Sequence, residues 1–335
     1  MKSQITIKDI ARELNISIST VSRALQGNKD ISKATIEKVK SYAHEHHYKP
    51  NSIALSLKKQ RTNIIGVIIP EFVHHFFSSV ISGIEDSANA SGYSVLVCQS
   101  SENYEKEIKC IDTLTSAQVS GVLASISKNN KDISHYRELI EDGTPLVFYD
   151  RFCPDLVTDH VVADDYSGAF QAVDYLAKSG CKKIALFRTG NNITIAKDRT
   201  NGYIDAIKAN GIAVDDSLIF DCDNRENAIK LTEKIIKSSS LPDAFFAVND
   251  DTASGIIYAL KRAGKRIPQD VSVCGFGDGI VAQISDPTIT TVEQNGYEMG
   301  VEACKLLIAR IESKDSMPVT QETIPTRLIL RESTK

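Results

Sequence analysis

Three helix start signals of the same kind lie within the first 36 residues, and they constrain the fold more than any other feature of the chain. Each is a hydroxyl residue with an apolar residue directly before it and another four positions after it; the hydroxyl residues are Thr6, Ser17 and Ser32. Such a hydroxyl accepts a backbone N–H of the first helical turn, while the two apolar side chains pack together over it. We therefore expect three short helices that begin near residues 7, 18 and 33. Apolar residues at helical spacing would give them one small core: Ile7, Ile10, Ala11, Leu14, Val21, Leu25, Ile36, Val39 and Tyr42.

The second expected helix keeps a polar face of short side chains and one long basic side chain. Ser19, Thr20, Ser22 and Arg23 form this face. Side chains this short allow a helix to enter the major groove of DNA, where an Arg reaches a guanine edge or a phosphate. The pattern predicts a DNA-binding helix-turn-helix, with an ordinary helical subdomain and a solvated face as the alternative.

The distribution of charge favours the DNA-binding interpretation. Residues 1–62 contain 12 Lys and Arg against 5 Asp and Glu, a balance of +7. The whole chain contains 39 against 43, so residues 63–335 contain 27 against 38, a balance of −11. A basic segment joined to an acidic remainder is typical of a module that binds nucleic-acid phosphates.

The remainder of the chain alternates short apolar runs with amphipathic helical patterns. Glycines close many of the helical patterns, for example at Gly92, Gly180 and Gly264. This alternation predicts right-handed βαβ units and parallel sheets, and the length favours two doubly wound sheets over one. The runs that we expect to be strands are 64–69, 94–98, 119–125, 145–149, 160–163, 182–187, 218–220, 244–248 and 271–276.

Ligand sites in such folds lie at the carboxyl ends of the strands. The glycines at 275, 277 and 279 resemble a phosphate-binding loop, but Ile280 stands where the dinucleotide pattern needs glycine, so a tight turn is the better interpretation. Asp250 and Asp251 could act as general acid and base, yet no nucleophile motif accompanies them. We expect them to hydrogen-bond a polyhydroxyl ligand, and we expect no catalytic residues. The expected strand-end segments are 70–77, 150–151, 188–199, 249–251 and 277–279.

Other features limit the remaining classes of protein. The seven cysteines include no Cys-x-x-Cys pair, and the histidines at 44, 46 and 47 have no ligand partners nearby, so we expect no metal and no cofactor. There is no apolar leader and no run of membrane-spanning length, which predicts a cytoplasmic protein without a membrane partner. After Pro50, residues 51–57 could form a helix of about two turns, which is too short to be stable without a partner. A basic linker follows at 58–63.

Together these segments resemble the lactose/galactose repressor family of bacterial transcription regulators. The resemblance covers essentially the whole chain, beginning with TIKDIARELNISISTVSRAL at 6–25 and continuing through YKPNSIALSL at 48–57 and IIGVIIP at 64–70. Further matches in the body are FF at 76–77, Asp150-Arg151, Arg199 with Gly202-Tyr203, Asn249-Asp250, GFGD at 275–278 and TTVEQ at 290–294.

The resemblance implies a division into three parts: a helix-turn-helix domain (1–49), a hinge helix with linker (50–62), and a body like type 1 periplasmic binding proteins (63–335). The body would comprise an N-subdomain (63–162 and 294–324) and a C-subdomain (163–293 and 325–335), joined by crossovers near 163, 293 and 325. In the DNA-binding domain, the resemblance places Ile18, Ser19 and Arg23 on base edges, and it places Thr6, Ser17, Thr20, Ser22, Ser32 and Thr35 on phosphates. In the hinge helix, Asn51 to Lys58, Ala54 would enter the minor groove and Leu57 would open the central base step.

In the body, the resemblance implies an effector cleft lined by Phe76, Phe77, Asp150, Arg199, Asn249 and Gln294. Family members often carry an acidic residue where Gly277 stands here, and the neighbouring Asp278 is then a further candidate, together with Asp250. Arg199 is expected to hold the ligand through its guanidinium, with an ion pair to Asp198 or another surface acid as the alternative. The ligand could be a sugar, a sugar acid, a sugar phosphate or, because of the two phenylalanines, a nucleobase.

The sequence therefore predicts a transcription regulator, more specifically a repressor, whose affinity for operator DNA changes when a small effector binds in the body. We expect a homodimer, or a tetramer built as a dimer of dimers, with coupling through the hinge. A sugar-binding receptor without DNA function and a metabolic enzyme are the alternatives. The presence of a basic N-terminal segment and the absence of a signal peptide disfavour the receptor. The absence of catalytic motifs disfavours the enzyme.

Overall fold

The computed structural model describes residues 5–25, 27–46, 48, 62–190, 193–238, 241–313 and 317–335. The chain divides into two compact units, residues 1–62 and residues 63–335. Among the described helices, none combines the length and apolar composition that a bilayer span requires.

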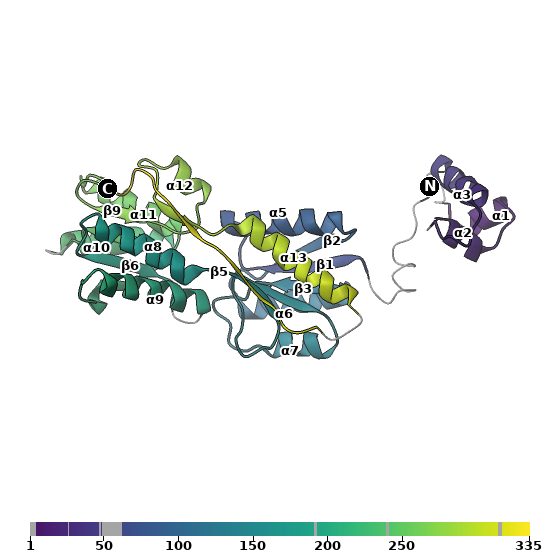
Figure 1. The fold of residues 1–335 in the computed structure, drawn as a ribbon, viewed down its shortest axis with the longest axis horizontal. Helices are drawn as coiled ribbons and strands as arrows, with labels where there is room; N and C mark the ends of the chain where they lie inside the picture. Colours follow the sequence, from purple (N-terminus) through teal and green to yellow (C-terminus); the bar gives the residue numbers. More distant parts are fainter. Residues whose placement is uncertain are drawn as a thin grey trace. The chain divides into compact units, whose positions relative to one another are not determined.

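The first unit contains three helices, α1 (Ile7–Glu13), α2 (Ile18–Leu25) and α3 (Lys33–Glu45), which confirm the three predicted starts (Figure 1). Thr6 accepts a hydrogen bond from the backbone N–H of Asp9, and Asp9 accepts one from Thr6 in return, which is a capping box. The hydroxyls of Ser17 and Ser32 accept from the N–H groups of Thr20 and Thr35. The buried core comprises Ile10, Ala11, Val21, Ala24, Val39 and Ala43.

The second unit begins with a six-stranded parallel sheet in the order β11-β5-β4-β3-β1-β2. Apolar side chains cover both of its faces because successive residues of a strand point to opposite sides. One face packs on α5 (His75–Ala90) and α13 (Gly296–Glu312), and the other packs on α6 (Tyr104–Ser116) and α7 (Ser134–Glu141). The strands are β1 (Ile64–Ile69), β2 (Ser94–Gln99), β3 (Gly121–Ala124), β4 (Leu146–Tyr149), β5 (Asp159–Ala163) and β11 (Gln321–Ile324).

Helices α5 and α13 approach each other closely at two glycines. A Cβ on Gly83 would collide with the carbonyl oxygen of Tyr297, and a Cβ on Gly300 would collide with that of Val80. The contact between the two helices therefore depends on bare backbone at both positions.

A second parallel sheet has four strands in the order β7-β6-β8-β9. Helices α8 (Asp165–Lys178) and α9 (Thr194–Ala209) cover one face, while α10 (Arg225–Lys237) and α11 (Asp250–Arg262) cover the other (Figure 1). The short helix α12 (Ile280–Ile284) follows β9, and a 3-10 turn (Asp216–Leu218) precedes β7. The strands are β6 (Ile184–Arg188), β7 (Ile219–Asp221), β8 (Ala244–Ala247) and β9 (Ser272–Cys274).

The nine strands predicted from apolar runs are all present, and three further strands are not among them. Two of these, β10 (Thr291–Glu293) and β12 (Arg327–Ile329), form a separate antiparallel pair. The chain passes between the two sheets after β5, after β10 and between β11 and β12. These three strands lie at the crossings or at the edge of the first sheet, and polar residues interrupt their apolar ones. They therefore lack the apolar run that identified the other strands.

Candidate DNA-binding face and effector cleft

The face of α2 that was predicted to read DNA is accessible. Ser17, Ser19 and Arg23 are exposed, Thr20 and Ser22 are half-buried, and Ile18 is 46% exposed although it is apolar. Burial of Val21 and Ala24 in the core fixes the opposite side of the helix. An exposed isoleucine beside hydroxyl groups suits contact with both the methyl groups and the polar edges of bases.

Hydrogen bonds hold the polar side chains of this face in place. The hydroxyl of Ser17 lies 2.7 Å from the Ser19 hydroxyl and 2.8 Å from the Thr20 hydroxyl. Arg23 pairs with Asp30 at 2.7 Å, and both side chains are about half exposed. Solvent screens such a pair, so Asp30 is a weak competitor for a guanidinium that DNA could also bind.

The predicted phosphate contacts of Ser17, Ser32 and Thr35 lie in the first turns of α2 and α3. Exposed N–H groups and the helix dipole favour anions at such positions. The predicted hinge residues Asn51, Ala54 and Leu57 lie outside the described residues.

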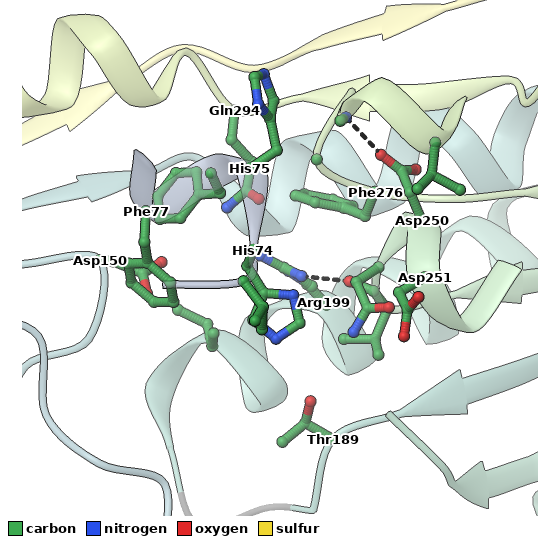
Figure 2. A pocket seen from close by; sticks show the side chains of 18 of the residues that line it. His74, His75, Phe77, Asp150, Thr189, Arg199, Asp250, Asp251, Phe276 and Gln294 are labelled. Carbon is green, nitrogen blue, oxygen red and sulfur yellow. Dashed lines mark hydrogen bonds between the residues drawn. The ribbon is translucent and has the colours of Figure 1, made fainter. Parts of the chain in front are cut away.

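In the second unit, a cleft of about 290 Å³ lies at the carboxyl ends of the strands of both sheets. Its lining includes seven of the eight effector residues predicted from the sequence: Phe76, Phe77, Asp150, Arg199, Asn249, Asp250 and Gln294. In the view of Figure 2, Phe77 and Asp150 lie on one side, Asp250 and Asp251 lie on the other, and Arg199 and Phe276 lie between them. The arrangement combines aromatic surface with hydrogen-bonding groups, as small-molecule sites commonly do.

Asp278, the eighth predicted residue, is not among the residues that line the cleft. Its carboxylate instead accepts a hydrogen bond of 2.6 Å from Arg331 near the end of the chain. The geometry gives Asp278 a structural partner, and we therefore leave it out of the candidate site.

Arg199 has a partner that the sequence did not indicate. Its Nε and Nη2 lie 2.7 Å from Oδ1 of Asp165, which is the first residue of α8, and not beside Asp198. Its Nη1 donates to the carbonyl oxygen of Val248 at 2.5 Å, and its guanidinium stacks over Phe276 with 3.8 Å to the ring centroid. A guanidinium has five N–H groups, so this arrangement still leaves donors for a ligand in the cleft.

Several lining residues were not among the predicted ones, and Arg151 is the most informative of them. It follows Asp150 directly after β4, and its Nη1 donates to Glu102 at 2.7 Å. Its position after a strand end was the available signal, and the same signal applies to Thr189 after β6. Asp251 was expected to hydrogen-bond the ligand, and it lines the cleft. The lining residues that lie in the predicted strand-end segments without having been named individually are Val73, His74, His75, Ile195, Gly277 and Gly279. Those outside the segments are Val248, Phe276, Ile280 and Val281.

One ion pair joins loops from the two sheets. Lys128, which follows β3, lies 3.0 Å from Asp223, which follows β7. The carbonyl oxygen of Asp223 accepts from Nδ2 of Asn249 in the cleft. The side chain of Asn249 is thus oriented by the same segment that contacts the opposite subdomain.

Burial raises the pKa of three carboxyl groups at this site. The pKa of Asp150 lies above its usual range, and those of Asp165 and Asp250 are raised to about 6. Arg199 opposes the shift at Asp165, and hydrogen bonds from Thr291 and Gly279 oppose it at Asp250. In the described ranges, no group of three or more His, Cys, Asp or Glu side chains could hold a metal ion.

The two units define a class of protein: a helix-turn-helix domain attached to a two-sheet body with a ligand cleft. Residues 6–51 match the model of the bacterial regulatory proteins of the lacI family, and residues 173–334 match the periplasmic binding protein-like domain. The chain is 33% identical to the ribose operon repressor of Halalkalibacterium halodurans over 332 residues, which are 98% of this chain and 97% of that protein.

Solved structures agree with these matches. The chain is similar to the transcriptional regulator CelR in complex with cellobiose, with a TM-score of 0.75, 26% identity, and coverage of 98% of this chain and 99% of that one. The lac repressor dimer bound to operator and an anti-inducer shares the fold, with a TM-score of 0.87, 22% identity, and coverage of 99% of both chains.

The chain belongs to the lacI family of bacterial regulatory proteins. It is a DNA-binding transcriptional regulator with a small-molecule cleft in its body, and members of this family are DNA-binding regulators that work as dimers.

Proposed function

We propose that this protein is a homodimeric repressor that acts in the cytoplasm, where its operator lies, and that a small effector in the body cleft changes its affinity for that operator. The observation that carries the proposal is the presence, in one chain, of an accessible polar recognition helix and a cleft whose lining comes from two subdomains. Ligand binding in such a cleft shifts the equilibrium between subdomain arrangements when the ligand prefers one of them.

The proposed roles on DNA are those that the family resemblance implies, and the exposed polar face of α2 supports the ones assigned to that helix. Ile18, Ser19 and Arg23 read base edges, while Thr6, Ser17, Thr20, Ser22, Ser32 and Thr35 bind phosphates. Residues 1–49 form the DNA-binding domain and residues 50–62 the hinge and linker, where Asn51, Ala54 and Leu57 contact the operator. This division makes the linker the mechanical connection between the body and the DNA-binding domain.

The proposed effector is a small sugar or sugar derivative. Polar groups on Asp150, Arg199, Asn249 and Gln294 suit ring hydroxyls, and the phenylalanine side chains suit the apolar face of a sugar ring. The names of two relatives, a ribose operon repressor and a regulator bound to cellobiose, agree with this class. A nucleobase stacked on the phenylalanines is the second candidate.

The proposed dimer brings together two copies through apolar side chains of the body. Ile284, which does not line the cleft, is 74% exposed. Exposed apolar groups of this kind are typical of protein interfaces. Light scattering of the purified protein distinguishes a monomer, a dimer and a tetramer.

A thermal-shift screen of sugars, sugar phosphates and purines tests the effector proposal. A ligand present at about 100 times its dissociation constant adds about 2.7 kcal/mol to the free energy of unfolding. A compound that raises the melting temperature of the wild type but not that of a variant of the half-buried Phe76, Phe76→Ala, would place the effector in the cleft. Equal shifts for both proteins would argue against this cleft as the site.

A further inference from the structure

Three glycines at alternate positions after β9 leave a space that one carboxylate fills. A Cβ on Gly275 would overlap Oδ1 of Asp250, and Cβ atoms on Gly277 and Gly279 would lie 3.5 and 3.7 Å from its Oδ2. Gly277 also has a φ of +126°, which side chains rarely adopt. The N–H of Gly279 donates to Asp250 (Figure 2). The loop that resembles a phosphate-binding sequence therefore surrounds an anion that belongs to the protein itself.

The carboxylate of Asp250 has unused capacity for hydrogen bonds. In the part of the chain that the structure describes, this carboxylate accepts a hydrogen bond of 2.6 Å from the Thr291 hydroxyl and one of 2.8 Å from the Gly279 N–H. An ionised carboxylate has about four acceptor positions. Asp250 lines the cleft, so a ligand there can donate to its remaining positions, and its exposure of only 6% keeps bulk water from screening the contact.

Among the described residues, Asp250 forms no ion pair. Arg331 partly offsets the burial that raises the pKa of Asp250, but its guanidinium is paired with Asp278. Glycine at 277 adds no carboxylate of its own, so Asp250 and Asp251 supply the negative charge on this side of the cleft.

The two arginines of the cleft do not supply a free positive charge either. Arg199 is bound by Asp165, and Arg151 is bound by Glu102. The lining adds three further carboxylates: Asp150, which lies 3.5 Å from Nε of Arg151, and Asp250 and Asp251, which form no ion pair among the described residues. Carboxylates therefore outnumber guanidinium groups in the cleft. A ligand that carries a negative charge would be repelled in this partly desolvated space.

We propose that Asp250 determines the specificity of the cleft: it accepts hydrogen bonds from a neutral polyhydroxyl ligand and disfavours phosphorylated or acidic sugars. This inference rests on the proposed function. It selects uncharged polyhydroxyl compounds from the sugars, sugar acids, sugar phosphates and nucleobases that are the candidate effectors. Asp250 supplies from α11 the acidic group that related sequences often carry at the position of Gly277.

Calorimetric titration of the full-length protein with matched probes tests the inference. The probes are D-ribose with D-ribose 5-phosphate, D-glucose with D-glucose 6-phosphate, and adenosine with adenosine monophosphate, together with free adenine, all at neutral pH and physiological salt. The variants are Asp250→Asn and, as a control that removes an exposed negative charge from α6, Asp112→Asn.

We expect the tightest probe to be an uncharged sugar or nucleoside, and we expect it to lose about tenfold in affinity in Asp250→Asn, which weakens a charge-assisted hydrogen bond. The phosphate ester of that probe should bind Asp250→Asn more tightly than it binds the wild type, a gain that a misfolded protein cannot show. Asp112→Asn should match the wild type for every probe.

A phosphate ester or free adenine as the tightest probe would overturn the inference while leaving the proposed function intact. Unchanged affinities in Asp250→Asn would overturn it in the same way. If no probe binds the wild type, the effector part of the proposed function fails together with the inference.

Discussion

Arg199 is both a lining residue of the cleft and one half of a buried ion pair, and the second property decides what its removal would do. Asp165 is almost completely buried beside it, and the pKa of Asp165 is already raised by burial. Removing the guanidinium leaves this carboxyl without its counter-charge.

We therefore predict that Arg199→Ala lowers the free energy of unfolding by about 3–5 kcal/mol at neutral pH. The reason is that the buried carboxylate of Asp165 then has no counter-charge to offset the cost of its desolvation. Denaturant unfolding followed by circular dichroism measures this change. Combining Arg199→Ala with Asp165→Asn should recover part of the loss; a double variant as unstable as Arg199→Ala would contradict the explanation.

Asp250 gives a prediction about pH. Its pKa of about 6 in the folded protein lies above the usual 3.8, so the folded state binds more protons than the unfolded state between about pH 4 and pH 6. The contribution of Asp250 to stability is therefore complete below pH 4 and is lost as the pH rises through 6.

Relative to Asp250→Asn, the wild type should lose roughly 2–3 kcal/mol of unfolding free energy between about pH 4 and pH 6. Denaturant titrations of both proteins across this range measure the difference. A constant difference between the two proteins would mean that the pKa of Asp250 is not raised.

The sequence predicts these residues unequally, for physical reasons. The apolar strand pattern predicted the segments that contain Phe76, Asp150 and Asn249, and the family resemblance singled out these residues within them. The partner of Arg199 could not be predicted, since Asp165 is 34 positions away and the pair forms only when α8 and α9 pack together. The pairing of Asp278 with Arg331 likewise depends on where the end of the chain returns to the second sheet.

At the scale of elements, α2 has the most direct functional consequence. Its cap and the burial of Val21 were predictable because they depend on neighbours three or four positions away, whereas Ala24, which is also buried, was not in the predicted core. The antiparallel pair of β10 and β12 was not predictable, because strands of three residues near the crossovers leave no periodic pattern.

For α2 we predict that Arg23→Ala weakens operator binding by about 1–3 kcal/mol and relaxes base preference at one position in each half-site. Mobility shifts on a set of operators mutated one base at a time measure both effects. Asp30→Asn serves as the control, because it removes the exposed partner of Arg23 and leaves the guanidinium in place. Unchanged affinity and preference in Arg23→Ala would remove this residue from base recognition.

At the scale of the whole molecule, residues 1–62 carry a net positive charge and residues 63–335 a net negative charge. We therefore expect DNA binding to depend on the first unit. Phosphate contacts release counterions from DNA, so the full chain should bind with an affinity that falls steeply as salt increases. The isolated segment 63–335 should not bind DNA in this way. Fluorescence anisotropy of labelled operator over a series of salt concentrations compares the two proteins, and equal binding by the truncated protein would contradict the division.

The central claim is that a ligand in the cleft controls binding to DNA, and one measurement tests it most directly: the operator affinity of the full-length dimer with and without a saturating effector. The account predicts a change of about fivefold or more, which corresponds to a coupling free energy of at least about 1 kcal/mol. The change should be absent in Phe76→Ala at the same effector concentration, because the half-buried Phe76 lines the cleft. An identical operator affinity in the presence and absence of an effector that calorimetry shows to be bound in the cleft would contradict the account.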